Sequence, residues 1–422
     1  MGVLIWLAAS SCQAQEWNPG KQLSQYIHDE SGRKLKLSFE FRMRPENRTG
    51  VTLGLDPDYT ALVTRTRVGM TWQPLPWLKM GGMMQDARVP GYGPGAPWNL
   101  RDPADLEEGY VEMHSASTGL GLSIGRMLLN YGEGRLIGVP HWSNVPRSFD
   151  QARLLYTRRR AQLELVFVSQ IKIRPEGFNR PVLGDHLWGT YNSFPDLFGK
   201  NRLEFYILRH NNSLVPGTGV NTAGFRLVGP LPARSRYSLE GALQNGRLAG
   251  ASHAAGAWYS LIGRQWTLAK RTLDISAEYK FASGTANPAD KSQNRTFDQL
   301  FPANHDKFGH EDLFGWRNMH NVRSLTTYSL TQALAANFMY DSYWLASPRD
   351  AVYNGNGRPV VADPSGKSGR HVGQEFDGYL TLRFDSLLFG GGYARLVPGE
   401  FLRKTRPGVH STFLYVFYMY SF

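Results

Sequence analysis

The chain has 422 residues, of which 41% are apolar and 13% aromatic, and its formal net charge is +12. Beyond the amino terminus no stretch approaches the ~20 consecutive apolar residues of a membrane-spanning helix, which excludes a helical membrane protein. The basic residues are scattered through strand-like segments and do not form a basic tail or helix. This pattern argues against a nucleic-acid partner and favours anionic solutes.

The amino-terminal residues 1–14 predict a secretory signal peptide, because an apolar core is followed by small residues up to Ala14. The basic n-region is missing, so the recorded start could be internal. Cys12 is the single cysteine and would leave with the signal. Lipidation at Cys12 is the alternative, although Ala9 is a poor residue three positions before it. Residues 15–33 are polar and unpatterned, and predict a short periplasmic lead-in.

From residue 34 the sequence alternates between apolar and polar side chains. In 34–44, Leu35 and Phe39 fall on the apolar face, whereas Arg42 and Arg44 fall on the polar face. This period of two predicts a strand with one face toward lipid and the other toward water. Further strands are predicted at 60–72, 77–88, 105–113, 119–127, 151–158, 160–172, 185–194, 202–210, 221–229, 234–244, 255–267, 271–282, 317–328, 334–344, 372–384, 387–396 and 411–422.

The last predicted strand ends on an aromatic residue, Phe422. Leu414, Val416, Tyr418 and Tyr420 share its face, and no charge or proline interrupts the run. A free apolar end is an aggregation hazard in a soluble protein, but it suits a closed barrel in lipid. A buried strand of a soluble sandwich is the alternative. A terminal strand ending in Phe resembles the closing strand of bacterial outer-membrane barrels, where it is the signal for the barrel-assembly machinery.

The links between the predicted strands support the same architecture. Several links after even-numbered strands are very short, for example Arg158-Arg159 and Asp385-Ser386. With an even total of about 18 strands, short and long links in alternation place both ends in the periplasm and the long loops outside. The sequence therefore predicts an all-β fold, a transmembrane antiparallel β-barrel forming one domain over 34–422. The long links are predicted at roughly 45–59, 89–104, 128–150, 283–316 and 345–371.

The segment 125–153 is rich in Gly, Arg, Asn and Trp. We expect it to fold back into the barrel and narrow it, with an ordinary solvated extracellular loop as the alternative. Trp142 is suited to stacking on sugar rings. Four arginines of the segment offer forked donors to carboxylates: Arg126, Arg135, Arg147 and Arg153.

Metal and enzyme sites are not predicted. His305-Asp306 and His310-Glu311-Asp312 are the candidate cation ligands, but their spacing matches no standard site. The Ser, His and Asp residues are not accompanied by a nucleophile elbow. We therefore expect no enzymatic activity and no cofactor, with a surface enzyme or an adhesin as the alternative.

Three stretches resemble the alginate-export family of outer-membrane proteins. The first two read GRxxLNYGEGRLIGVPHWSNVPRSFD from Gly125 and TFDQLFPANHDKFG…GWRN from Thr296. The third begins at Arg65 as RTRVG and ends at Arg88 as QDAR. The resemblance covers most of the mature chain. It implies a monomeric barrel of about 18 strands, with an electropositive lumen that conducts an anionic uronate polymer across the outer membrane.

From the alternation we also predict a ladder of inward-pointing basic residues along the lumen. Each would attract carboxylates weakly enough to release them. The alternative is that these residues pair with interleaved acids such as Glu40 and Asp377 and only fill the lumen. The predicted substrate-binding residues are Arg42, Arg44, Arg65, Arg67, Arg126, Arg135, Arg153, Arg226, Lys280, Arg317, Arg323 and Arg383.

The predicted function is passive passage of an anionic polysaccharide or oligosaccharide through the outer membrane. An anion-selective or substrate-specific porin for small acidic solutes is the alternative. The expected partners are the acidic substrate and outer-membrane lipids, with a periplasmic export protein at the short turns as a further candidate.

Overall fold

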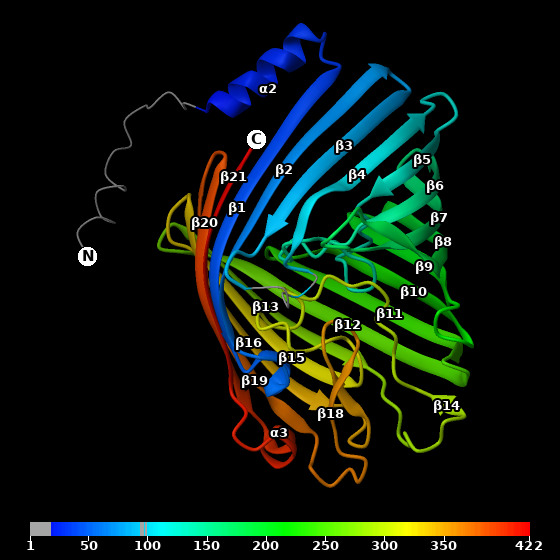
Figure 1. Cartoon of the computed structure of the whole chain (residues 1–422), viewed down its shortest axis with the longest axis vertical. Coiled ribbons are helices and arrows are strands. Elements are labelled where there is room, and N and C mark those ends of the chain that lie inside the picture. Colours follow the sequence, from blue (N-terminus) through cyan, green and yellow to red (C-terminus); the bar gives the residue numbers. More distant parts are fainter. Residues whose placement is uncertain (1–17, 93–96, 98) are drawn as a thin grey trace, which may run out of the picture.

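The computed structural model describes residues 18–92, 97 and 99–422, so the predicted signal peptide and Cys12 lie outside the described residues. Within them, 18 strands form one antiparallel wall (Figure 1). The first strand, β1 (Leu35–Thr49), pairs with the last, β21 (Ser411–Ser421), and this pairing closes the barrel. The closed sheet excludes the soluble sandwich that was the alternative for the carboxy terminus.

Each other strand of the wall pairs with its neighbour along the chain. A two-residue strand, β14 (Gln293–Asn294), adds to β12 in parallel. The remaining strands of the wall are β2 (Tyr59–Leu75), β3 (Leu78–Arg88), β4 (Asp102–His114), β5 (Leu120–Met127), β6 (Phe149–Arg158), β7 (Ala161–Lys172), β8 (Arg180–Phe198), β9 (Asn201–Asn212), β10 (Thr218–Leu231), β11 (Ser235–Leu248), β12 (Ala251–Leu268), β13 (Arg271–Ala282), β15 (Met319–Ser329), β16 (Leu334–Leu345), β19 (His371–Phe384) and β20 (Leu387–Pro398).

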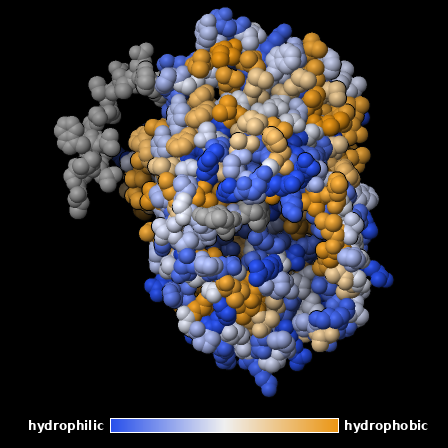
Figure 2. Space-filling view, viewed as in Figure 1, coloured by the Kyte–Doolittle hydropathy of each residue, from blue (hydrophilic) through white to orange (hydrophobic). Residues whose placement is uncertain are grey.

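The structure contains a strand at each predicted position. The prediction succeeds because apolar and polar side chains alternate along each strand, with the apolar ones facing lipid. In β2 the side chains of Arg65 and Arg67 are buried, whereas Val68 and Met70 are exposed on the outer face. Figure 2 shows apolar residues over the upper strands and along one flank, and hydrophilic residues around a central hollow. The outward apolar belt is the surface that a bilayer covers.

The links depart from the predicted alternation at two places. Long loops follow β1, β3, β5, β13 and β16 as predicted, but only Ala249 and Gly250 connect β11 to β12. Both residues have positive φ, 50° and 82°, which allows a two-residue hairpin. β9 and β10 are also joined by a short link. The strands themselves therefore extend further in this part of the wall.

A helix, α2 (Pro19–Glu30), occupies the segment predicted to be an unpatterned lead-in. Asn18 caps it and Pro19 opens its first turn, both common signals of a helix start. The Ser24 hydroxyl donates to the Leu37 carbonyl of β1, and the Tyr420 hydroxyl of β21 donates to Asn18. The helix therefore lies across the seam that closes the barrel, close to the carboxy terminus (Figure 1).

The remaining elements lie in the loops at the opposite end from α2 (Figure 1). No helix in the described ranges combines the length and the apolar character that crossing a bilayer requires. The loop elements are a short 3-10 turn, η1 (Val51–Gly54), the hairpin β17 (Ala351–Tyr353) and β18 (Pro359–Ala362), and α3 (Glu400–Thr405).

Candidate functional site

Two long loops fold into the barrel and meet there. They are the β5–β6 loop (128–148) and the β13–β15 loop (283–318). Ile137 of the first forms an isolated parallel bridge with Phe301 of the second. The predicted inward fold of 125–153 is thus confirmed, and the second loop joins it. Apolar side chains of both loops form a buried core inside the wall, including Leu129, Leu136, Ile137, Phe297, Phe301, Phe308, Phe314 and Trp316.

Arginines of the wall hold the β5–β6 loop by its backbone. Arg42 and Arg65 both donate to the Ser143 carbonyl oxygen, at 3.0 Å in each case. Arg44 donates to the Trp142 carbonyl at 2.6 Å. These guanidinium groups therefore use some of their donors to fix the loop and to satisfy carbonyls that are away from water.

Stacked rings join the two loops. The indole of Trp142 lies parallel to the His305 ring at 4.2 Å, and His305 stacks on His310 at 4.6 Å. The His305 Nδ1 atom lies 2.9 Å from an Asp312 carboxylate oxygen. Burial alone would raise the pKa of Asp312, but the facing His305 and Arg48 hold it below its usual value. Burial lowers the pKa of His310 well below its usual range, so that ring is neutral.

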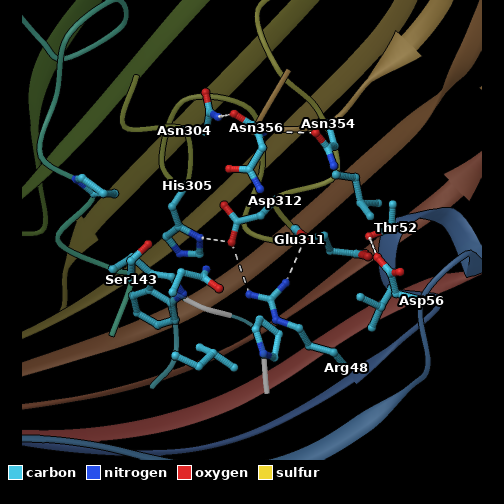
Figure 3. Close-up of a pocket in the computed structure, with 18 of the residues that line it drawn as sticks. Arg48, Thr52, Asp56, Ser143, Asn304, His305, Glu311, Asp312, Asn354 and Asn356 are labelled. Atoms are coloured by element: carbon cyan, nitrogen blue, oxygen red, sulfur yellow. Dashed lines mark hydrogen bonds and ion pairs between the residues drawn. The ribbon is translucent and has the colours of Figure 1, made fainter. Parts of the chain in front are cut away.

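A cavity of about 360 Å³ opens between these loops at the long-loop end of the barrel. We call it the outer cavity; Figure 3 shows its lining from β1, η1 and both inward loops. Arg48 crosses its floor, donating to the Glu311 carbonyl at 2.9 Å and lying 3.2 Å from Asp312. The lining combines four guanidinium groups and four carboxylates with asparagine amides and aromatic rings. Its guanidinium and amide groups are the ones that hold carboxylates and hydroxyls. The four acids are Glu46, Asp56, Glu311 and Asp312.

Arg147 and Arg358 are the cavity arginines without an acidic partner within the described residues. Among the described residues, the Arg147 side chain donates only to the Pro302 carbonyl, at 3.1 Å, and its buried Nε atom has no hydrogen-bond partner. Burial lowers the pKa of Arg147 to about 10, so the group is still charged at neutral pH. Arg147 is one of the forked donors predicted from the sequence, but it is not among the predicted substrate-binding residues.

Most of the predicted substrate-binding residues have acidic partners. Arg323 lies 2.9 Å from Asp341, and both side chains are almost fully buried. Arg226 bridges Glu204 and Glu133 at 2.9 Å each. The other pairs are Arg44–Glu46, Arg65–Glu40, Arg67–Glu107, Arg126–Asp150, Arg135–Glu133, Arg153–Glu164, Lys280–Glu278 and Arg317–Asp298.

Two of the predicted residues differ from this pattern. Arg42 donates to carbonyls and to Asn144, and Arg383 is exposed beside the β19–β20 turn. The pairing matches the alternative in which charges fill the lumen, and a role of these residues in binding stays a prediction. Within the described residues no three His, Cys, Asp or Glu side chains form a group that could hold a metal ion.

Comparison with known proteins gives one family and one fold. The model of the family described as "Alginate export" matches residues 34–416. OpdK from Pseudomonas aeruginosa has a similar structure, with a TM-score of 0.65 at 11% identity, covering 92% of this chain and 98% of OpdK. OccAB4 from Acinetobacter baumannii gives 0.62 at 11% identity, over 92% and 98%.

A third similar structure is OccK5 (OpdH) from Pseudomonas aeruginosa, with a TM-score of 0.61 at 10% identity over 92% of this chain and 98% of that one. The search of curated proteins gives no match. The family match spans nearly the whole wall and both inward loops, which are the parts that carry the resemblance in sequence. The chain therefore belongs to the Alginate export family, as a non-enzymatic β-barrel channel of the bacterial outer membrane.

Proposed function

We propose that this channel passes acidic saccharides and that the outer cavity holds their carboxylates during passage. The observation that supports this most directly is the pair of guanidinium groups, Arg147 and Arg358, that face the cavity without acidic partners among the described residues. A guanidinium binds a carboxylate through two parallel hydrogen bonds, which a uronate supplies at every sugar unit. Trp142 also lines the cavity, but its ring already stacks on His305 and lies 4.1 Å from the Arg44 guanidinium, so it holds the loops together and does not offer a free face to a sugar.

The size and the chemistry of the cavity fit a short stretch of saccharide. Its volume of about 360 Å³ is at the lower end of the ~300–1,000 Å³ typical of small-molecule sites. Asn304, Asn354 and Asn356 line it and offer amide donors and acceptors to hydroxyl groups. A channel must also release what it binds, and a cavity with two arginines that have no acidic partner among the described residues, beside acidic side chains that compete for them, satisfies that condition.

In this proposal the paired basic residues of the wall exchange partners. Arg226, for example, already shares its donors between Glu204 and Glu133. A passing carboxylate would replace one acidic partner at a time, so each step would be weak and reversible. The ten predicted residues that have acidic partners then act as a series of exchange sites along the path.

A small acidic solute is the second candidate substrate. The two inward loops place a buried aromatic core inside the wall, which leaves less room for a polymer than for a small molecule. One similar structure is that of OpdK with vanillate, a small carboxylate. At 9% identity that likeness concerns the fold, so the choice between the two substrates depends on the experiment below.

Planar-bilayer recordings test the proposal. In a salt gradient the reversal potential should indicate anion preference, and short polyuronates should block the current reversibly. Arg147→Gln together with Arg358→Gln should weaken the block about tenfold or more, because a hydrogen bond to a charged group contributes about 1.5–3 kcal/mol. Lys367→Gln, an exposed lysine outside the cavity, is the matched control and should leave the block unchanged.

The same recordings separate the two substrates. Block by monomeric uronate without block by polyuronate would favour the small-solute channel. Cation preference, or an equal block in the double variant and the control, would refute the role of the cavity.

A further inference from the structure

The basic residues at the short-turn end of the barrel are concentrated on one side. Four neighbouring turns, β6–β7, β8–β9, β10–β11 and β12–β13, carry nine basic and two acidic side chains in the turns and the adjoining strand ends. This surplus of seven charges compares with +12 for the whole chain. We call this set the basic arc: Arg158, Arg159, Arg160, Lys200, Arg202, Arg234, Arg236, Lys270 and Arg271.

The other short turns carry no such surplus. The β4–β5 and β15–β16 turns contain no Lys, Arg, Asp or Glu. Beside the β2–β3 turn Lys79 pairs with Glu112 at 2.8 Å, and Asp385 in the β19–β20 turn pairs with Lys21 of α2. A solvated rim around a barrel has no reason to gather its cations on one half, so the asymmetry indicates a localised anionic partner.

Three turn positions with left-handed backbone carry basic residues of the arc. Arg159, Arg234 and Lys270 have positive φ angles of 55°, 54° and 61°. Tight hairpin turns normally place Gly or Asn at such positions, because other side chains are strained there. Outside the arc the positive-φ turn residues include Gly119 and Asp385, and alanines also adopt this conformation at Ala233, Ala249 and Ala269.

The arc faces the mouth of the barrel as well as the surrounding solvent. Side chains alternate along a strand, so Arg202 shares the inner face of β9 with Glu204. Arg236 likewise shares the inner face of β11 with Ser238, whose hydroxyl donates to Glu133 of the inward β5–β6 loop. These two residues are therefore on the path into the lumen, where a lipid headgroup of the surrounding membrane would not reach.

We propose that the basic arc is a docking site for the acidic polysaccharide chain on the periplasmic side, which captures the chain before it enters the lumen. The inference rests on the proposed function, because the ligand is the same acidic saccharide. Two acidic residues reduce the net positive charge of the arc, because Asp196 pairs with Arg160 and Asp274 pairs with Arg236 at 2.7 Å. The other seven basic side chains form no ion pair within the described residues, and exposed cations of this kind raise the rate at which a polyanion is captured.

The turn geometry permits a clean test. The triple variant Arg159→Asn, Arg234→Asn and Lys270→Asn removes three charges and places a residue that tolerates positive φ at each position, so the barrel should fold at least as well. The matched control removes three exposed charges from the long-loop end: Lys291→Asn, Arg295→Asn and Lys367→Asn. Folding of each is checked by heat-modifiable mobility on gels.

The measurement is binding of fluorescently labelled polygalacturonate to the full barrel in nanodiscs of zwitterionic lipid. The arc variant should bind about tenfold more weakly at low salt, as expected for electrostatic capture, and the control variant should bind like the natural chain. If the natural chain, the arc variant and the control variant bound polygalacturonate equally, or if both variants lost the same affinity, the arc would not be the docking site. Loss of anionic-lipid retention without loss of polygalacturonate binding would also overturn it, in favour of a lipid site.

Bilayer recordings keep the two proposals apart. If polygalacturonate binds through the arc but never blocks the current, the proposed passage of acidic saccharides is refuted, whereas docking at the arc is supported. If polygalacturonate blocks the current and the arc variant binds it as the natural chain does, docking at the arc is refuted, whereas the proposed passage of acidic saccharides is supported.

Discussion

Asn144 should control how firmly the β5–β6 loop is held inside the barrel. Its side chain is fully buried, and its Nδ2 atom donates to the Thr64 and Leu100 carbonyls at 2.8 Å each. Its Oδ1 atom accepts a hydrogen bond from Arg42 at 3.1 Å. Asn144→Ala removes these three bonds, together with a longer one from Nδ2 to the Arg88 carbonyl at 3.4 Å, and leaves buried partners unsatisfied.

The size of the effect follows from these contacts. Two neutral hydrogen bonds contribute about 0.5–1.5 kcal/mol each, and the bond to the guanidinium about 1.5–3 kcal/mol. A loss of roughly 3 kcal/mol would raise the population of the displaced loop on the order of 100-fold. The wall should stay intact, because its strands are held by pairing with both neighbours.

Two assays check this expectation. In single-channel recordings the variant should enter higher-conductance states more often, because the displaced loop leaves the lumen. Trypsin should also cut after Arg135 and Arg147, which are largely shielded when the loop is inside. Ser143→Ala is the matched control, since the Ser143 hydroxyl forms no hydrogen bond within the described residues. If the two variants gave the same conductance and the same cleavage, Asn144 would not hold the loop.

Two further predictions concern buried charges. Burial raises the pKa of Glu311 to about 7 from an ordinary value of 4.5, so its contribution to stability falls as the pH rises from about 4 to above 7. Glu311→Gln should therefore raise the melting temperature at pH 8.5 and leave it unchanged at pH 4; equal shifts at both would contradict this. Arg323→Met should lower the free energy of unfolding by about 3–5 kcal/mol, because Asp341 is left buried without its partner. Arg323→Met with Asp341→Leu should regain most of that loss in urea unfolding, and a double variant no more stable than the single would refute the pairing.

The wall could be predicted from the sequence because each strand has one face toward lipid and one face toward the polar lumen. Met43 and Arg44 are neighbours in sequence, yet one is exposed on the lipid face and the other is buried in the lumen. This alternation is local and can be read without knowing any contact. The predicted strands 185–194 and 255–267 are shorter than the observed strands β8 and β12, whose ends are defined by pairing with their neighbours.

The site could be predicted only in part, because its contacts are distant in sequence. The inward fold of 125–153 was expected from composition, but its anchors on Arg42 and Arg65 depend on pairings about 100 and 80 residues apart. The outer cavity gathers Arg48, Arg147 and Arg358 from three separate segments. The alternation of side chains predicts which arginines point inward, but not which of them find an acidic partner. Among the described residues Arg147 has none, whereas most of the inward arginines of the wall have one. The α2 helix, in a segment predicted to be unpatterned, does have a local start signal in Asn18 and the proline that follows it.

The net positive charge of the chain lies more at the short-turn mouth of the barrel than inside the wall, so capture and passage of an anion should depend differently on salt. Inside the wall most basic residues are matched by acids, as Arg226 is by Glu204, so the packed interior contributes little of the chain's net charge. The basic arc is exposed at the short-turn end, where salt screens charges beyond ~8 Å at physiological ionic strength. Capture at the arc should then weaken steeply as salt is added. Exchange within the lumen, where the pairs are buried, should change much less. A single salt titration of capture rate and of conductance would therefore report separately on the mouth and on the path.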